Sequence, residues 1–131
     1  MVWKQIRGVI AAAGWLVILG VTPCTARAAE QISPAAAKEA ADIYNTRCVT
    51  CHGPTGKGDG PVGAALSPKP RDLSDPAWQK SVTDEHIDKI ILSGGGAVGK
   101  SPLMPSNPDL AAKPEVVKAL RALVRGFAPH Q

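Results

Sequence analysis

The chain has 131 residues, enough for a single domain, with 44% hydrophobic residues and a formal net charge of +4. Much of the basic character belongs to the first 28 residues: without Lys4, Arg7 and Arg27, the 15 basic residues become 12 against 11 acidic ones, a net charge of +1. Because no arginine-rich stripe or aromatic ladder accompanies this small excess, the composition gives no support for nucleic-acid binding.

Residues 1–28 have the order of a secretory signal peptide. Two basic residues precede the apolar run VIAAAGWLVILGV, and Ala26-Arg27-Ala28 has the small-x-small form of a cleavage site. The apolar run is shorter than the roughly 20 residues that a membrane-spanning helix needs, which favours cleavage over an uncleaved anchor. We therefore expect a periplasmic protein, secreted across the inner membrane, whose mature domain comprises residues 29–131.

A first helix is predicted at residues 34–47. Ser33 can cap its N-terminus with Pro34 at the first helical position, and the apolar residues that follow lie on one stripe at helical spacing. This helix would deliver Cys48 at its end. From Gly53 to Trp78 the density of glycine and proline predicts a loop. So long a loop is uncommon in a compact domain unless it has a role, such as wrapping a flat ligand.

Two more helices are predicted in the second half of the chain. In TDEHIDKIILSGG, Thr83 or Ser81 can serve as the N-cap, two acidic residues suit the first turn, and Gly94 suits the end. After a second Gly/Pro-rich loop, a last helix is expected from near Pro114 to about Arg125. No segment shows the alternation typical of a strand. The predicted fold class is all-α, with about three principal helices and long loops.

The candidate cofactor site is the sequence CVTCHG at residues 48–53. The spacing of Cys48, Cys51 and His52 is that of c-type haem attachment, in which two thiols add to the vinyl groups of haem b and the histidine binds the iron. One copy of the motif predicts one covalently bound haem c. The alternatives explain less: structural zinc needs four Cys or His ligands, a thioredoxin-like dithiol expects a βαβ setting, and a plain disulfide leaves His52 unexplained.

A haem iron with one histidine ligand needs a second axial ligand or an open site. Methionine and a second histidine are the usual choices in electron-transfer proteins. Once the leader is removed, Met104 is the only methionine, and it lies in the proline-bracketed sequence SPLMPSN. His86, in the first turn of the second helix, and His130, beside the C-terminus, are the rival ligands.

These motifs resemble those of the class I c-type cytochromes, most of all the small bacterial monohaem group similar to the cytochrome c domains of cbb3-type oxidase subunits. The resemblance covers about residues 35–126 and implies the class I cytochrome c fold around one haem. It is carried by Cys48-x-x-Cys51-His52-Gly53, Gly56-x-Gly58-Asp59-Gly60-Pro61, Leu66-x-Pro68-x-Pro70-x-Asp72-Leu73 and Met104-Pro105.

The resemblance also implies a role for each site residue. Cys48 and Cys51 would carry the haem, with His52 as the proximal and Met104 as the distal iron ligand. Pro61 matches the proline whose carbonyl accepts the other ring N–H of the proximal histidine, a bond that orients the ring and raises its basicity.

The chain departs from the family pattern at two positions. Ala40 stands where the first helix usually has a glycine, and Leu123 stands where the last helix often has an aromatic residue. We therefore expect the same fold with a lighter contact between these helices and less reserve stability. Because the mature chain keeps one Trp, one Tyr and one Phe, folding should depend on the haem.

The predicted function is electron transfer rather than catalysis, by one-electron Fe(II)/Fe(III) cycling through an exposed haem edge, with no catalytic residues. The first hypothesis is a monomeric carrier between a redox-protein donor and acceptor, with possible transient contacts to membrane respiratory complexes. The alternative is a dedicated cytochrome subunit of a dehydrogenase or terminal oxidase. A catalytic or gas-sensing haem with an open site would require Met104 to be off the iron.

Four basic residues lie in the loops expected to surround the haem. They could steer an acidic partner towards the haem edge, or they could be ordinary solvated loop residues. They are Lys57, Lys69, Arg71 and Lys100.

Overall fold

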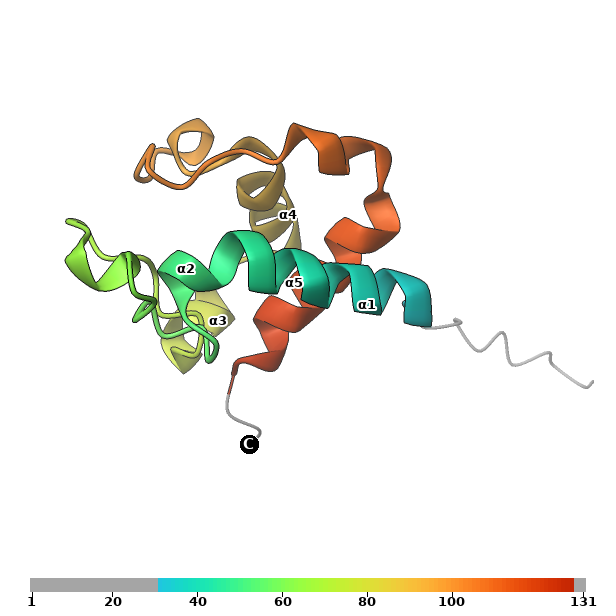
Figure 1. The fold of residues 1–131 in the computed structure, drawn as a ribbon, viewed down its shortest axis with the longest axis horizontal. Coiled ribbons are helices and arrows are strands. Elements are labelled where there is room, and N and C mark those ends of the chain that lie inside the picture. The colour runs from blue at the N-terminus through green and yellow to red at the C-terminus, as the bar shows by residue number, and fades with distance from the viewer. Residues whose placement is uncertain (1–30, 129–131) are drawn as a thin grey trace, which may run out of the picture.

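The computed structural model describes residues 31–128. The predicted signal peptide and His130 lie outside the described residues. Within the described range the chain is all-helical and contains no strand, which confirms the predicted class. In Figure 1, α1 (Pro34–Ile43) crosses α5 (Pro114–Gly126), and α4 (Asp84–Ser93) lies behind them. No helix between residues 31 and 128 has the length and hydropathy required to span a membrane.

The first helix begins as predicted but continues further. The Ser33 hydroxyl accepts a hydrogen bond from the Ala36 N–H at 3.2 Å, and Pro34 occupies the first turn. After α1 the helical path continues through a π-helical turn, η1 (Tyr44–Cys48), into α2 (Val49–His52). Turns of this kind are rare and are frequently found at functional sites. The whole cysteine motif is therefore part of a continuous helical segment rather than of the loop that follows.

The helices α4 and α5 follow the local signals in the sequence. The Thr83 hydroxyl caps α4 by accepting a hydrogen bond from the His86 N–H at 3.2 Å, and Gly94 ends the helix with φ +77°. Pro114 occupies the first turn of α5. The predicted bounds of both helices agree with the structure to within a residue or two.

The prediction of an uninterrupted loop from Gly53 to Trp78 is wrong at its end. The helix α3 (Pro76–Ser81) begins inside it, with the Asp75 carboxylate accepting a hydrogen bond from the Ala77 N–H at 2.9 Å. Asp75-Pro76 is the same start signal as Ser33-Pro34. The helix is only six residues long, and its apolar positions are too few to show a stripe. Short 3₁₀ turns also interrupt the loops: η2 (Gly63–Ala65), η3 (Gly96–Val98) and η4 (Pro108–Ala112).

The main core lies between α1 and α5. Ala40 is 1% exposed at this contact, so the alanine is accommodated where the family has glycine. Leu123 is only partly buried, and the aromatic contact is made four residues later by Phe127. The Phe127 ring centroid lies 5.3 Å from that of Tyr44, with the rings tilted by 48°. Such a pair adds to burial of the rings, and the family's aromatic contact is therefore present from a different position.

A polar network joins α3, α4 and α5. The Arg125 guanidinium donates to the Asp84 carboxylate at 2.7 Å, to the Val82 carbonyl at 2.8 Å and to the Gln79 carbonyl at 2.7 Å. The Gln79 side chain in turn donates to the Val124 carbonyl, near the end of α5, at 2.9 Å. Because these bonds fix α4 against α5, they also fix the opposite side of α4, where the candidate site lies.

Candidate functional site

A cavity of about 730 Å³ lies between the helical cysteine motif, the loop before α3, α4 and the loop that carries Met104. Its volume is in the range of sites that bind cofactors and other small molecules. Much of its wall is apolar, including Leu66, Leu73, Trp78, Ile90, Ile91 and Leu120. Four of the five predicted site residues line it, namely Cys48, Cys51, His52 and Met104.

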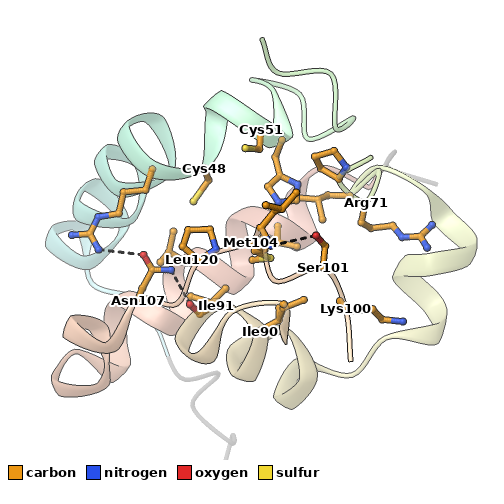
Figure 2. A pocket seen from close by; sticks show the side chains of 18 of the residues that line it. Cys48, Cys51, Arg71, Ile90, Ile91, Lys100, Ser101, Met104, Asn107 and Leu120 are labelled. Carbon is orange, nitrogen blue, oxygen red and sulfur yellow. Dashed lines mark hydrogen bonds between the residues drawn. The ribbon is translucent and has the colours of Figure 1, made fainter. Parts of the chain in front are cut away.

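The two cysteines lie three residues apart on helical backbone, which places them on one face of the segment. Figure 2 shows both side chains at one side of the cavity and Met104 facing the same space. In the described part of the chain both thiols are free, and both are half-buried. Burial raises the pKa of the Cys48 thiol, and the neighbouring Arg47 opposes this shift. Cys48 is therefore a neutral thiol at pH 7.

His52 ends α2 on the same wall of the cavity. Burial lowers the pKa of its imidazole, and the backbone carbonyl of Arg71 partly opposes the shift. At pH 7 the ring is therefore neutral, the form that binds a metal ion. Its Nδ1 atom is buried and has no hydrogen-bond partner among the described residues. A buried nitrogen without a partner costs about 1–3 kcal/mol, so the ring is suited to a site in which a bound group fixes its orientation.

Pro61 is the one predicted site residue that does not line the cavity. It is exposed, in the loop after the motif. Because Nδ1 of His52 lacks a partner within residues 31–128, the expected hydrogen bond to the Pro61 carbonyl is not formed in this structure. The role of Pro61 stays a prediction that follows from the family resemblance.

Met104 is held by the end of α4. Its carbonyl accepts a hydrogen bond from the Gly95 N–H at 3.0 Å, and its own N–H donates to the Ser101 carbonyl at 3.2 Å. Three residues later, the Asn107 N–H donates to the Leu92 carbonyl at 2.9 Å. The last carbonyls of a helix have no partner within the helix, and the loop satisfies one of them here.

Asn107 is a site residue that the sequence analysis missed. Its side chain donates to the Ile91 carbonyl at 2.8 Å and accepts from the Arg47 guanidinium at 3.3 Å (Figure 2). Arg47 also pairs with Asp109 at 3.0 Å. Asn107 therefore links the methionine loop, the end of α4 and the residue that precedes Cys48. A polar side chain shortly after Met104-Pro105 was the only available signal, and it names none of these partners.

The rival ligands have different positions. His86 lies in the first turn of α4, is half-buried and lines the cavity, so its place is compatible with a role near a bound group. His130 lies outside the described residues. Between residues 31 and 128 no group of three or more His, Cys, Asp or Glu side chains is placed to hold a metal ion. The zinc alternative therefore has no ligand set in this part of the chain.

Three of the four predicted docking residues lie on the wall or rim of the cavity: Lys69, Arg71 and Lys100. Lys57 is exposed but does not line it. Asp72 is the one acidic side chain on the wall, and hydrogen bonds from Ser74 hold the pKa of its carboxyl below the usual value. The cavity mouth is therefore predominantly basic.

Comparison with known proteins points to one family. The family model described as cytochrome c oxidase, cbb3-type, subunit III matches residues 35–124. The cbb3-type cytochrome c oxidase subunit FixP of Azorhizobium caulinodans is 34% identical over 97 residues, 73% of this chain. The chain spans 29% of the length of that relative. The solved structure of the KustC0563 c-type cytochrome has 34% identity and a TM-score of 0.52, covering 66% of this chain and 94% of that one.

Proposed function

Because this chain belongs to the family of cbb3-type cytochrome c oxidase subunit III and is a class I c-type cytochrome with covalently bound haem c, we propose that it is a periplasmic one-electron carrier. In this proposal residues 1–28 are a cleaved leader and residues 29–131 form the haem domain. The intact mass of the secreted protein tests the boundary, and retention of the first 28 residues would contradict it.

Cys48 and Cys51 hold the haem in this proposal. Each thiol adds its sulfur to one carbon of a vinyl group and its proton to the other, so the two thioethers form without an oxidant. The proposal is supported by two free thiols on one face of a helical segment, directed to one cavity. A covalent link also keeps the cofactor in place outside the cytoplasm.

His52 and Met104 are the proposed axial ligands. His52 brings a neutral imidazole, and Met104 brings a thioether from the opposite end of the sequence to the same cavity. When bound, the haem supplies a reversible one-electron Fe(II)/Fe(III) couple whose potential methionine ligation raises relative to bis-histidine ligation. The apolar wall excludes water from the ligands, and Lys69, Arg71 and Lys100 provide cationic charge at the rim.

The observation that carries this proposal is the meeting of Cys48, Cys51, His52 and Met104 on one cavity of about 730 Å³. The test is an absorption spectrum of protein matured in a host with a haem-attachment system. We expect a c-type reduced spectrum and the weak red-edge sulfur-to-iron band in the oxidised form. The band should vanish in Met104→Ala and persist in His86→Ala, the matched control on the same cavity. A high-spin wild-type protein without the band would instead favour a catalytic or ligand-binding haem.

A second candidate function is that of a dedicated subunit of a terminal oxidase. The observation that favours it is the relationship to an oxidase subunit family and to FixP. The two roles differ in how tightly the partner is held, because transient redox complexes have small interfaces. Purification from the native membrane under increasing salt separates them. A carrier is washed free, whereas a subunit stays with its oxidase.

A further inference from the structure

Gly95, directly after the end of α4, lies between the two sides of the loop that bears Met104. Its N–H donates to the Met104 carbonyl at 3.0 Å. Its own carbonyl accepts from the Lys100 N–H at 2.9 Å and from the Val98 N–H at 3.1 Å. Both the outgoing and the returning parts of the loop are therefore bonded to this one buried residue.

The glycine is required at this position for space and not for backbone conformation. Gly95 has φ −66° and ψ −39°, which any residue adopts. A Cβ atom built there would overlap the Ser101 carbonyl oxygen and lie 3.3 Å from the Met104 Cβ. At the next residue, Gly96, the nearest atoms to such a Cβ belong to Pro102 at 3.8 Å, an ordinary contact.

The backbone that a side chain would displace is the backbone that locates Met104. The Ser101 carbonyl, which the added Cβ would overlap, accepts the Met104 N–H at 3.2 Å. The far end of the loop cannot follow easily, because Asn107 is bonded to the Leu92 and Ile91 carbonyls through its N–H and its side chain. The displacement would therefore be concentrated between residues 101 and 104.

We propose that Gly95 is a positioning residue for Met104, and that its missing side chain sets how firmly the methionine sulfur is held in the cavity. The inference rests on the proposed function, in which Met104 is the distal ligand. It assigns a role in ligation to a residue that contributes no side chain to the site.

The experiment compares the holoprotein of Gly95→Ala with that of Gly96→Ala. Each variant adds one methyl group, at neighbouring positions of the same loop. The readouts are the sulfur-to-iron band of the oxidised form during a guanidinium titration and the rate of carbon monoxide binding to the ferrous form. Far-UV circular dichroism in the same titration reports global unfolding, which a merely structural role would change in parallel with the band.

For Gly95→Ala we expect the band to disappear at a lower denaturant concentration than the helical signal, and carbon monoxide to bind about tenfold faster or more, as for overpacking at a ligand support. Gly96→Ala should match the wild type in both. If Gly95→Ala keeps the wild-type band and binding rate, or if its band and helical signal shift together, the inference is overturned while Met104 ligation stands. A wild-type protein without the band would overturn the proposed ligation itself.

Should Gly95→Ala fail to mature, Ser101→Gly tests the same turn without adding an atom. The Ser101 hydroxyl accepts a hydrogen bond from the Leu103 N–H at 3.3 Å, within the turn that Gly95 supports. Its removal should weaken the band and speed carbon monoxide binding to a smaller extent. An unchanged band and rate in this variant would overturn the inference.

Discussion

The contact between α1 and α5 is filled by protein alone, whereas the wall around the cavity is completed by the cofactor. At the first, Ala40 is 1% exposed and Leu110 is 0% exposed, and the Tyr44 and Phe127 rings are in contact. At the second, Met104 is only half-buried, and the buried Nδ1 of His52 has no partner within the described chain. Two parts of one small domain thus depend on different partners, chain packing on one side and haem on the other.

The largest expected effect comes from removing the haem altogether. In a Cys48→Ala, Cys51→Ala variant the cavity wall has nothing to pack against, and the small α1–α5 core must oppose the chain entropy alone. We expect most of the helical circular dichroism signal to be lost. A wild-type holoprotein prepared in parallel is the control. Native-like helicity in the double variant would show that the α1–α5 packing is sufficient by itself, and would remove the dependence on haem.

The comparison is sharpened by truncating one side chain on each side. Leu110→Ala removes a fully buried side chain from the protein-packed core, and we expect it to lower the free energy of unfolding by about 2–5 kcal/mol without changing the sulfur-to-iron band. Ile90→Ala removes a half-buried side chain from the cavity wall. It should change the haem spectrum or carbon monoxide binding more than the unfolding midpoint. Equal spectral effects in both variants would erase the distinction between the two regions.

Tyr44 lies where the two regions meet. Its hydroxyl donates to the Gly53 carbonyl, next to His52, at 2.8 Å. At pH 7, Tyr44→Phe should lower the free energy of unfolding by about 1–3 kcal/mol, because the carbonyl loses a buried partner. A denaturant titration of the two proteins at pH 7 measures this difference.

The same pair of proteins gives a pH dependence with a definite sign. Burial raises the pKa of Tyr44 to about 12 from its model value of 10.0. The folded state therefore binds the proton more tightly than the unfolded state, and the stability from the neutral phenol is lost as pH rises from about 10 to 12. The advantage of wild type over Tyr44→Phe should shrink across this range. An advantage that stays constant would contradict the raised pKa and leave only the hydrogen bond.

The sequence predicts best those features whose causes are local. Ser33-Pro34 and Thr83 mark the starts of α1 and α4 because capping involves residues within one turn of each other. The cysteine spacing predicts the haem for the same reason, since both thiols and the histidine come from two helical turns. Asp75-Pro76 carried the same kind of signal, but the Gly/Pro density around it hid α3.

What the sequence could not predict depends on contacts between distant segments. Phe127 takes the aromatic role expected at position 123 because the end of α5 reaches Tyr44, 83 residues earlier. Gly95 and Asn107 were unremarkable until the fold placed them against Met104 and α4. In both cases the residue type is ordinary and its significance comes from its neighbours in space.

The smallest expected effect concerns charge at the cavity mouth, which only the haem side carries. Lys69 and Lys100 lie on the rim, whereas Lys38 is far along the first helix and pairs with Asp42. If the rim steers anions to the haem, reduction by an anionic iron–EDTA complex should slow by roughly two- to fivefold in Lys69→Glu, Lys100→Glu. The rate should also fall as salt increases.

The controls separate steering from a change in the haem itself. Lys38→Glu makes the same kind of charge change at a distance from the cavity, and it should leave the rate unaltered. A cationic reductant such as hexaammineruthenium(II) should react faster with the rim variant, because the sign of the interaction reverses. If both reductants slowed equally, the substitutions would have altered the cofactor environment. If the wild-type rate with the anionic complex proved independent of salt, the basic residues would be ordinary solvated side chains, and partner choice would depend on the shape and apolar surface of the cavity mouth.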